Sequence, residues 1–315
     1  MTEQLYTVIG GSGFVGRYIV QALAEAGHRV RVAVRHPNQA LFLKPLGAVG
    51  QVLPVAANVT DEGSIARAVE GADGVVNLVG ILHGSTKQFE ALQVEGAERV
   101  ARLAKAAGAQ RFVQMSAIGA DAERDDVDYA RTKGEGEEAV KAAFPEATIL
   151  RPSIVFGPED AFLNRFADLA RKSPFMPLIC GSTQFQPVYV VDVADATFAA
   201  LTTDTYQGQT YWLGGPKVYS FKDLLTYIMD EAMQKRPFLP IPAGIAEIQG
   251  AVMSLLPNPP LTRGQVKMLR GDNVVPEGAL GIDAFGITPT PVESIAPSYL
   301  VRHRPHGRFS KKDAV

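Results

Sequence analysis

A glycine-rich turn between a short apolar run and a helical pattern constrains the fold of this chain most strongly. Residues 5–9 read LYTVI, Gly10, Gly13 and Gly16 follow at intervals of three, and residues 14–26 have helical periodicity. Because glycine lacks a Cβ, the backbone can pass at close range from a strand through a tight turn into a helix. The segment therefore predicts a strand, turn and helix within the first 26 residues.

A turn of this kind is typical of a dinucleotide-binding site. Gly10 permits the tight turn, Gly13 allows the backbone to approach a pyrophosphate, and Gly16 allows the helix to pack closely on the strand. The free N–H groups and the dipole of the helix N-terminus favour the phosphates. A glycine turn without a ligand is the alternative. The candidate cofactor-binding residues here are Gly10, Gly11, Ser12, Gly13, Phe14, Val15 and Gly16.

Alternation of β-branched runs with helical patterns continues through residue 150. Strand-like runs are found at residues 5–9, 29–34, 49–55, 74–78, 111–115 and 147–150, and helical patterns at 14–26, 62–70, 86–107 and 127–143. Repeated βαβ units build a parallel sheet with helices on both faces. The sequence therefore predicts an α/β fold, a Rossmann-type doubly wound parallel sheet.

Prolines interrupt the chain frequently after Arg151-Pro152, and the regular alternation ends there. We expect a dinucleotide-binding domain over residues 1–151, with additional core elements from about 187–213, and a smaller mixed substrate or docking domain over 152–315. Within the additional elements, residues 188–191 and 209–213 are expected to be strands, and Asp192 to be the N-cap of the next helix.

Composition excludes several classes of protein. A formal net charge of −2 and a pI near 6.2 argue against a nucleic-acid binder with a broad basic face. The single cysteine, Cys180, excludes an intramolecular disulfide and a cysteine-based zinc site, and no metal is expected. No run of 18 apolar residues is present, and the first strand begins too early to leave room for a signal or transit peptide. A cytoplasmic protein is expected.

The end of the second predicted strand bears on the choice of cofactor. An NAD site usually places a carboxylate there to bind the ribose 2′-OH, whereas this chain has Arg35-His36. A cation at this position suits a 2′-phosphate, so NADP(H) is favoured over NAD(H). The alternative is a solvent-exposed arginine at a strand end.

The GxxGxxG spacing resembles that of the extended and atypical short-chain dehydrogenase/reductase superfamily. The resemblance implies that Asn58 and Val59 lie against the adenine, although Asn58 departs from the aspartate usual there. It also implies that the segment Asn77-Leu78-Val79-Gly80 lines the middle of the cofactor, and Pro152 after the sixth strand belongs to the same candidate set.

Tyr129 and Lys133 form a YxxxK pair, which places both side chains on one helix face. A nearby ammonium stabilises a phenolate and is expected to bring proton transfer by the tyrosine within reach of neutral pH. Ser116 ends the fifth strand, where enzymes of the superfamily donate a hydrogen bond to the substrate oxygen. The candidate catalytic set is therefore Ser116, Tyr129 and Lys133. A half-buried tyrosine with an exposed lysine is the structural alternative.

A second resemblance covers nearly the whole chain. Residues 151–167, RPSIVFGPEDAFLNRFA, together with 144–150, 187–194 and 261–275, resemble the nucleotide-binding accessory subunits of respiratory complex I (NADH:ubiquinone oxidoreductase), of the alpha-subcomplex subunit nine type, and their bacterial relatives. This resemblance implies tight NADPH binding in a structural or regulatory role, with complex I as partner. The retained Ser116, Tyr129 and Lys133 leave an active oxidoreductase or sugar-nucleotide epimerase or dehydratase open as the alternative.

Three features of the C-terminal half suggest a docking surface. Apolar residues 245, 248, 252 and 255 share one face of a predicted helix, and Arg263, Lys267 and Arg270 share a face of the next. The tail adds a net charge of +4 from Arg302, Arg304, Arg308, Lys311 and Lys312 against Asp313. Peripheral contact with the inner face of the plasma membrane is one interpretation, while ordinary domain packing and a frayed tail are the others.

Overall fold

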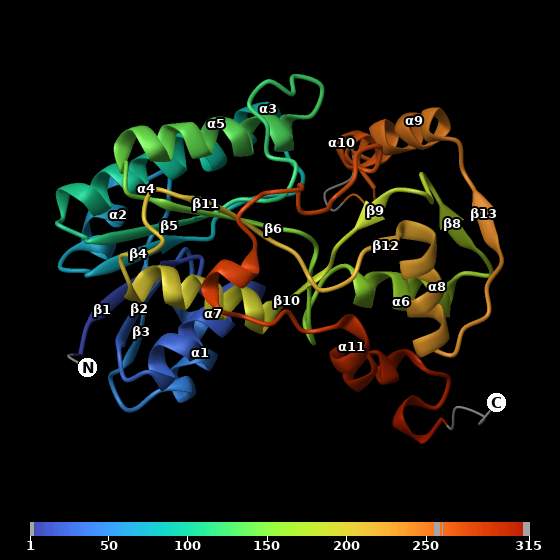
Figure 1. Cartoon of the computed structure of the whole chain (residues 1–315), viewed down its shortest axis with the longest axis horizontal. Helices are drawn as coiled ribbons and strands as arrows, with labels where there is room; N and C mark the ends of the chain where they lie inside the picture. Colours follow the sequence, from blue (N-terminus) through green and yellow to red (C-terminus); the bar gives the residue numbers. More distant parts are fainter. Residues whose placement is uncertain (1–2, 255–258, 260, 311–315) are drawn as a thin grey trace. The chain divides into compact units, whose positions relative to one another are not determined.

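A computed structural model describes residues 3–254, 259 and 261–310 (Figure 1). Its chain divides into two units, and the first contains a seven-stranded parallel sheet in the order β11-β6-β5-β4-β1-β2-β3. The order reverses between β1 and β4, which makes the carboxyl edge at these two strands the switch point of the sheet. The strands are β1 (Leu5–Ile9), β2 (Arg29–Val34), β3 (Val52–Ala56), β4 (Gly74–Asn77), β5 (Arg111–Met115), β6 (Thr148–Pro152) and β11 (Thr210–Leu213).

Helices cover both faces of this sheet, as the prediction of a doubly wound fold requires (Figure 1). On one face α2 and α5 flank α4, and on the other α1 packs against α7. Short helical turns occur at η1 (Pro37–Leu46) and η3 (Ile282–Phe285). The longer elements are α1 (Phe14–Glu25), α2 (Glu62–Val69), α3 (Thr86–Phe89), the π-helical η2 (Glu90–Val94), α4 (Glu95–Ala106), α5 (Asp128–Ala143) and α7 (Val190–Thr202).

Apolar side chains of the strands and of the covering helices form the core of the first unit. Val75, Phe112 and Ile149 of the sheet pack with Val100 and other residues of α2, α4 and α5. Parallel strands are buried on both faces, and this explains their nearly continuous apolar sequences. The core thereby fixes the sheet whose carboxyl edge carries the candidate site.

Most predicted elements of the first unit agree with the structure, and three differ. The third strand begins three residues later than predicted. The expected helix over 86–107 is interrupted by the π-helical turn η2. Asp192 is not an N-cap, because α7 begins at Val190 and Asp192 lies within its first turn. The apolar residues at 190 and 191 suit a buried helix start as well as a strand, so the pattern did not separate the two.

The second unit consists of three segments of chain, residues 153–189, 214–276 and those from 289 onward. Residues 277–288 belong to the first unit and were not among the additional core elements expected from the sequence. The elements are short because prolines remove backbone donors. They are the two-stranded sheets β7 (Val155–Phe156) with β10 (Val188–Tyr189), β8 (Met176–Leu178) with β13 (Phe238–Pro240) and β9 (Gln184–Phe185) with β12 (Tyr219–Ser220), and helices α6 (Leu163–Lys172), α8 (Phe221–Glu231), α9 (Ala243–Met253), α10 (Arg263–Met268) and α11 (Val292–Leu300).

Two arginines of the basic C-terminal segment contact their own unit. Arg302 donates to the Pro158 carbonyl at 3.0 Å, and Arg304 forms an ion pair with Glu231 at 3.2 Å, where both side chains are largely buried. For these two residues the expectation of a frayed, solvated tail is wrong, because nearby acceptors within the second unit hold the segment. Residues 311–315, with Lys311 and Lys312, lie outside the described residues. No helix among the described residues is both long and apolar enough to cross a membrane.

Candidate functional site

The glycine turn is folded as tightly as its sequence suggests. Gly10 has a φ of +81°, in the left-handed region that favours glycine. A Cβ on Gly16 would lie 2.6 Å from the Cα of Gly11 and 2.8 Å from the Gly10 carbonyl oxygen. The first turn of α1 therefore packs directly on the backbone of the turn. This approach brings the N-terminus of α1 to the switch point of the sheet.

The N-terminus of α1 suits an anion. Its N-cap is Gly13, no side chain caps the helix, and its first turn contains no acidic residue. A Cβ on Gly13 would meet only the Gly10 carbonyl oxygen within 4 Å, so this side of the turn is open. Uncapped N–H groups and the helix dipole favour a phosphate at such a position. Gly10 to Gly16 therefore fit a pyrophosphate group.

Arg35 lies where the sequence predicts it, directly after β2 and exposed to solvent. It forms no ion pair within the part of the chain that the structure describes. A parallel sheet places the ends of β1 and β2 at the same edge, and residues 5–9 pair in register with 29–33. The guanidinium is thus at the edge of the sheet that carries the glycine turn.

The residues expected along the cofactor differ in how exposed they are. Asn58 is exposed, and its Oδ1 accepts a hydrogen bond from the Thr60 N–H at 3.2 Å. Val59 is buried in the core against Gly96 of α4. Asn77 is fully buried, and its amide donates to Gln114 at 3.0 Å, so its side chain stabilises the sheet.

The segment after β4 lies beside the glycine turn. A Cβ on Gly10 would lie 3.6 Å from side-chain atoms of both Leu78 and Val79, and one on Gly80 would lie 3.0 Å from the Lys133 ammonium. These distances place Leu78, Val79 and Gly80 between the glycine turn and α5. Pro152 ends β6 buried, and its carbonyl accepts from the Ile118 N–H at 3.0 Å.

Lys133 is buried and contacts the last residue of β5. Its ammonium donates to the Met115 carbonyl at 3.1 Å, directly before Ser116. Burial lowers the pKa of this ammonium to about 8, although the Glu137 carboxylate raises it. The lysine is therefore mostly protonated at neutral pH. Because its side chain is buried, the alternative of an exposed lysine is wrong.

Tyr129 lies in the first turn of α5 and is partly buried. Burial raises the pKa of its phenol to about 12. The sequence analysis expected Lys133 to lower this pKa. Desolvation instead raises it, and the Lys133 ammonium donates to the Met115 carbonyl.

Ser116 is buried at the end of β5, and its hydroxyl donates to the Glu137 carboxylate. Glu137 in turn accepts two hydrogen bonds from Arg151, at 2.9 and 2.7 Å. Sequence reasoning missed both charged partners. The spacing of Glu137 four residues after Lys133, on the same helix face, was the available signal.

Gln93 is a further buried polar residue that the sequence analysis missed. It lies in the π-helical turn η2, and its amide donates to the Thr132 hydroxyl at 3.0 Å. Its Oε1 is buried and has no hydrogen-bond partner among the described residues. A Cβ on Gly136 would lie 2.0 Å from the Gln93 carbonyl oxygen, so α5 packs directly on this turn.

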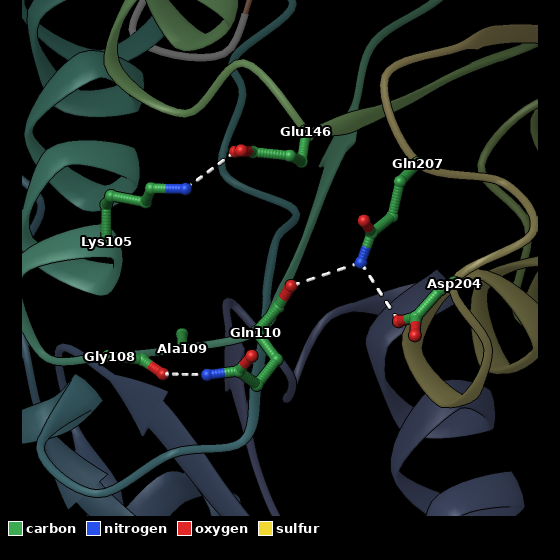
Figure 2. Close-up of a pocket in the computed structure, with 7 residues that line it drawn as sticks. All are labelled: Lys105, Gly108, Ala109, Gln110, Glu146, Asp204 and Gln207. Atoms are coloured by element: carbon green, nitrogen blue, oxygen red, sulfur yellow. Dashed lines mark hydrogen bonds and ion pairs between the residues drawn. The ribbon is translucent and has the colours of Figure 1, made fainter.

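A polar hollow of about 340 Å³ lies elsewhere in the first unit (Figure 2). Its lining residues include Gln110 directly before β5, Glu146 before β6 and Gln207 before β11. Figure 2 shows Lys105 and Glu146 directed at each other. The Lys105 Nζ lies 2.7 Å from a carboxylate oxygen of Glu146. Residues that precede parallel strands lie at the amino edge of the sheet. The hollow is therefore at the edge opposite to the glycine turn.

Comparison with known proteins gives one family and several relatives. The family described as "NAD dependent epimerase/dehydratase family" matches residues 6–214. "NADH dehydrogenase [ubiquinone] 1 alpha subcomplex subunit 9, mitochondrial" of Arabidopsis thaliana is 36% identical, over 96% of this chain and 78% of that protein. "Ceramide reductase" of Caulobacter vibrioides is 34% identical, over 59% of this chain and 57% of that protein.

Solved structures support the fold. The crystal structure of DesIV, a dTDP-glucose 4,6-dehydratase from Streptomyces venezuelae with NAD and TYD bound, aligns with a TM-score of 0.66. The alignment covers 76% of this chain and 84% of that one, at 19% identity. This likeness confirms the Rossmann-type α/β fold predicted from the sequence.

Two alanine substitutions separate packing from ligand approach in the glycine turn. Gly16→Ala forces backbone atoms apart, so we expect the free energy of unfolding to fall by about 1–3 kcal/mol. Gly13→Ala places its methyl group 3.3 Å from a single backbone atom, the Gly10 carbonyl oxygen, so we expect a smaller stability loss of about 1 kcal/mol but a large loss of NADPH affinity. Urea unfolding and NADPH fluorescence titration measure the two effects. A Gly13→Ala protein with unchanged NADPH affinity would contradict a phosphate site at this turn.

Proposed function

Because the chain belongs to the NAD dependent epimerase/dehydratase family, we propose that it binds NADP(H) and holds it for a structural or regulatory purpose. The observation that carries the proposal is the open, uncapped N-terminus of α1 at Gly13. Gly10 to Gly16 hold the pyrophosphate, and Leu78, Val79 and Gly80 border the middle of the cofactor. When bound, the nicotinamide supplies a site for hydride transfer.

Preference for NADP(H) follows from Arg35. An exposed guanidinium at the end of β2 offers a bidentate donor to the 2′-phosphate of NADP(H), whereas NAD(H) has only a hydroxyl there. No carboxylate follows β2 directly to accept from that hydroxyl, since the next residues are His36 and Pro37.

Retention of the cofactor without turnover is supported by the protonation states near Lys133. A phenol with a pKa of about 12 is a poor general acid or base at neutral pH. The Lys133 ammonium is directed to the Met115 carbonyl, and Ser116 donates to Glu137. The alternative is an oxidoreductase or epimerase that uses Tyr129 and Lys133. Such an enzyme requires the hydrogen bonds of Lys133 and Ser116 to be replaced by contacts with the substrate or cofactor when the substrate binds.

A partner is suggested by the relatives named as subunits of mitochondrial NADH dehydrogenase, which match nearly the whole chain. We propose that this protein associates with a respiratory NADH dehydrogenase. Affinity capture of the tagged chain from detergent-solubilised membranes of its source should recover other subunits of that enzyme. Capture without any such subunit would contradict the association.

The surface of α9 supports peripheral contact with a membrane on its inner face. Ile245, Ile248 and Val252 are 52%, 69% and 64% exposed on one side of the helix. Arg263 of α10 and Arg270 just after α10 pair with Glu247 of α9, and both arginine side chains remain more than half exposed. An apolar helix face flanked by cations is typical of helices that lie on anionic bilayers.

A charge reversal at Arg35 tests the choice of cofactor. For Arg35→Asp we expect NADPH affinity to fall about 10-fold to 100-fold, because a charged hydrogen bond contributes about 1.5–3 kcal/mol. NADH affinity should rise, since a carboxylate can accept from the ribose 2′-OH. Arg29→Asp, at the opposite end of β2, is the matched control and should change neither affinity. Parallel losses for both nucleotides in Arg35→Asp would exclude recognition of the 2′-phosphate.

Vesicle sedimentation tests the α9 surface. In vesicles of equal parts phosphatidylcholine and phosphatidylglycerol, we expect Ile248→Asp with Val252→Asp to weaken binding at least about tenfold. The reason is that each large aliphatic side chain contributes about 1.5–3 kcal/mol when buried. Val49→Asp, a fully exposed position of the first unit, is the control and should bind like the original protein. Equal sedimentation of all three proteins would rule out membrane contact through α9.

A further inference from the structure

An ion pair between Arg151 and the buried Glu137 contacts the serine of the candidate site. Glu137 is 3% exposed, and its two oxygens accept from Nε and a terminal nitrogen of Arg151 at 2.9 and 2.7 Å. The Arg151 guanidinium lies over the Trp212 ring, 5.1 Å from its centroid, where β6 pairs with β11. Both ends of the pair are therefore fixed by regular secondary structure.

The ion pair determines which partner donates in the hydrogen bond between Ser116 and Glu137. A guanidinium stays protonated in proteins, and a carboxylate that it binds through two hydrogen bonds is ionised. An ionised carboxylate can only accept hydrogen bonds. The Ser116 hydroxyl contacts the same Glu137 oxygen as the Arg151 Nε, so the hydroxyl must donate its single proton to Glu137.

We propose that Glu137, held by Arg151, is a positioning residue that makes Ser116 a hydrogen-bond acceptor toward any ligand. The inference rests on the proposed function and refines it. Only the lone pairs of the Ser116 oxygen remain for a ligand. The group that suits this position is a donor, such as an alcohol hydroxyl or an amide N–H, and a carbonyl oxygen does not suit it.

This arrangement gives a physical reason for retention of a reduced cofactor. Reduction of a carbonyl places negative charge on its oxygen, which requires hydrogen-bond donors at that position. Ser116 presents lone pairs instead, and the Lys133 ammonium of α5 is already directed to the Met115 carbonyl. A ligand hydroxyl group satisfies Ser116, but the saturated carbon that bears this hydroxyl cannot accept hydride from a reduced nicotinamide.

Isotope-resolved NMR of the serine hydroxyl tests the proposal without any ligand. In protein labelled with carbon-13 at serine Cβ and dissolved in equal parts of light and heavy water, a slowly exchanging hydroxyl gives two resolved Cβ signals. We expect Ser116, assigned by loss of its signal in Ser116→Ala, to give two. A single averaged signal for Ser116 in the unmodified protein would overturn the proposal.

Variants of the charged residues identify the acceptor. In Glu137→Gln we expect hydroxyl exchange at least about tenfold faster, because hydrogen bonds to charged groups are roughly twice as strong as neutral ones. Glu138→Gln, exposed on the same helix, should leave the two signals unchanged. Arg151→Lys keeps a cation beside the carboxylate and should also retain them, which provides a test if Glu137→Gln does not fold.

The outcomes are independent of cofactor binding. Exchange that stays equally slow in Glu137→Gln would show that the charge of Glu137 does not hold the Ser116 hydroxyl and would overturn the proposal, whatever nucleotide the protein binds. A protein that fails to bind NADPH while Ser116 shows the expected signals would instead contradict the proposed function alone.

Discussion

The close approach of α1 to the glycine turn is the constraint on which the site depends. The two backbones can approach at Gly16 and Gly11 only without a side chain between them. Because this contact forms at the switch point of the sheet, the N-terminus of α1 and the ends of β2 and β4 are brought to one edge. Phosphate binding and the position of Arg35 both follow from this geometry.

One face of helix α5 extends from the carboxyl edge of the sheet into the core of the first unit. Tyr129, Lys133 and Glu137 follow each other at intervals of four residues, and burial increases along the helix. Each buried charge has a partner within the first unit: Lys133 has the Met115 carbonyl and Glu137 has Arg151. Such pairing offsets the cost of removing the charges from water. The same pairing fixes which atoms remain to meet a ligand.

The elements of the fold that depend on short stretches of sequence could be predicted from the sequence. The glycine turn, the alternation of strands and helices and the fifth strand with Ser116 were all readable, because periodicity and glycine spacing act over a few residues. The Ser116, Glu137 and Arg151 cluster was not readable, since its members are brought together only by the packing of α5 on β5 and β6. Residues 277–288 joined the first unit for the same kind of reason.

The surface of α9 shows a different limit. An apolar stripe at helical spacing is typical of a core helix and of a docking helix alike, and the sequence left both open. The structure exposes Ile248 and Val252 while Ala246 and Gly250 are buried, because the small residues allow α10 to approach. Which side of a helix is covered depends on its neighbour.

The central claim is that the protein holds NADP(H), and the nucleotide content of the freshly purified protein tests it most directly. Heat release followed by mass identification should recover close to one equivalent of NADPH per chain. A protein that is empty on purification and binds NADPH only weakly and reversibly would contradict the account and would favour an enzyme that exchanges its cofactor at each turnover.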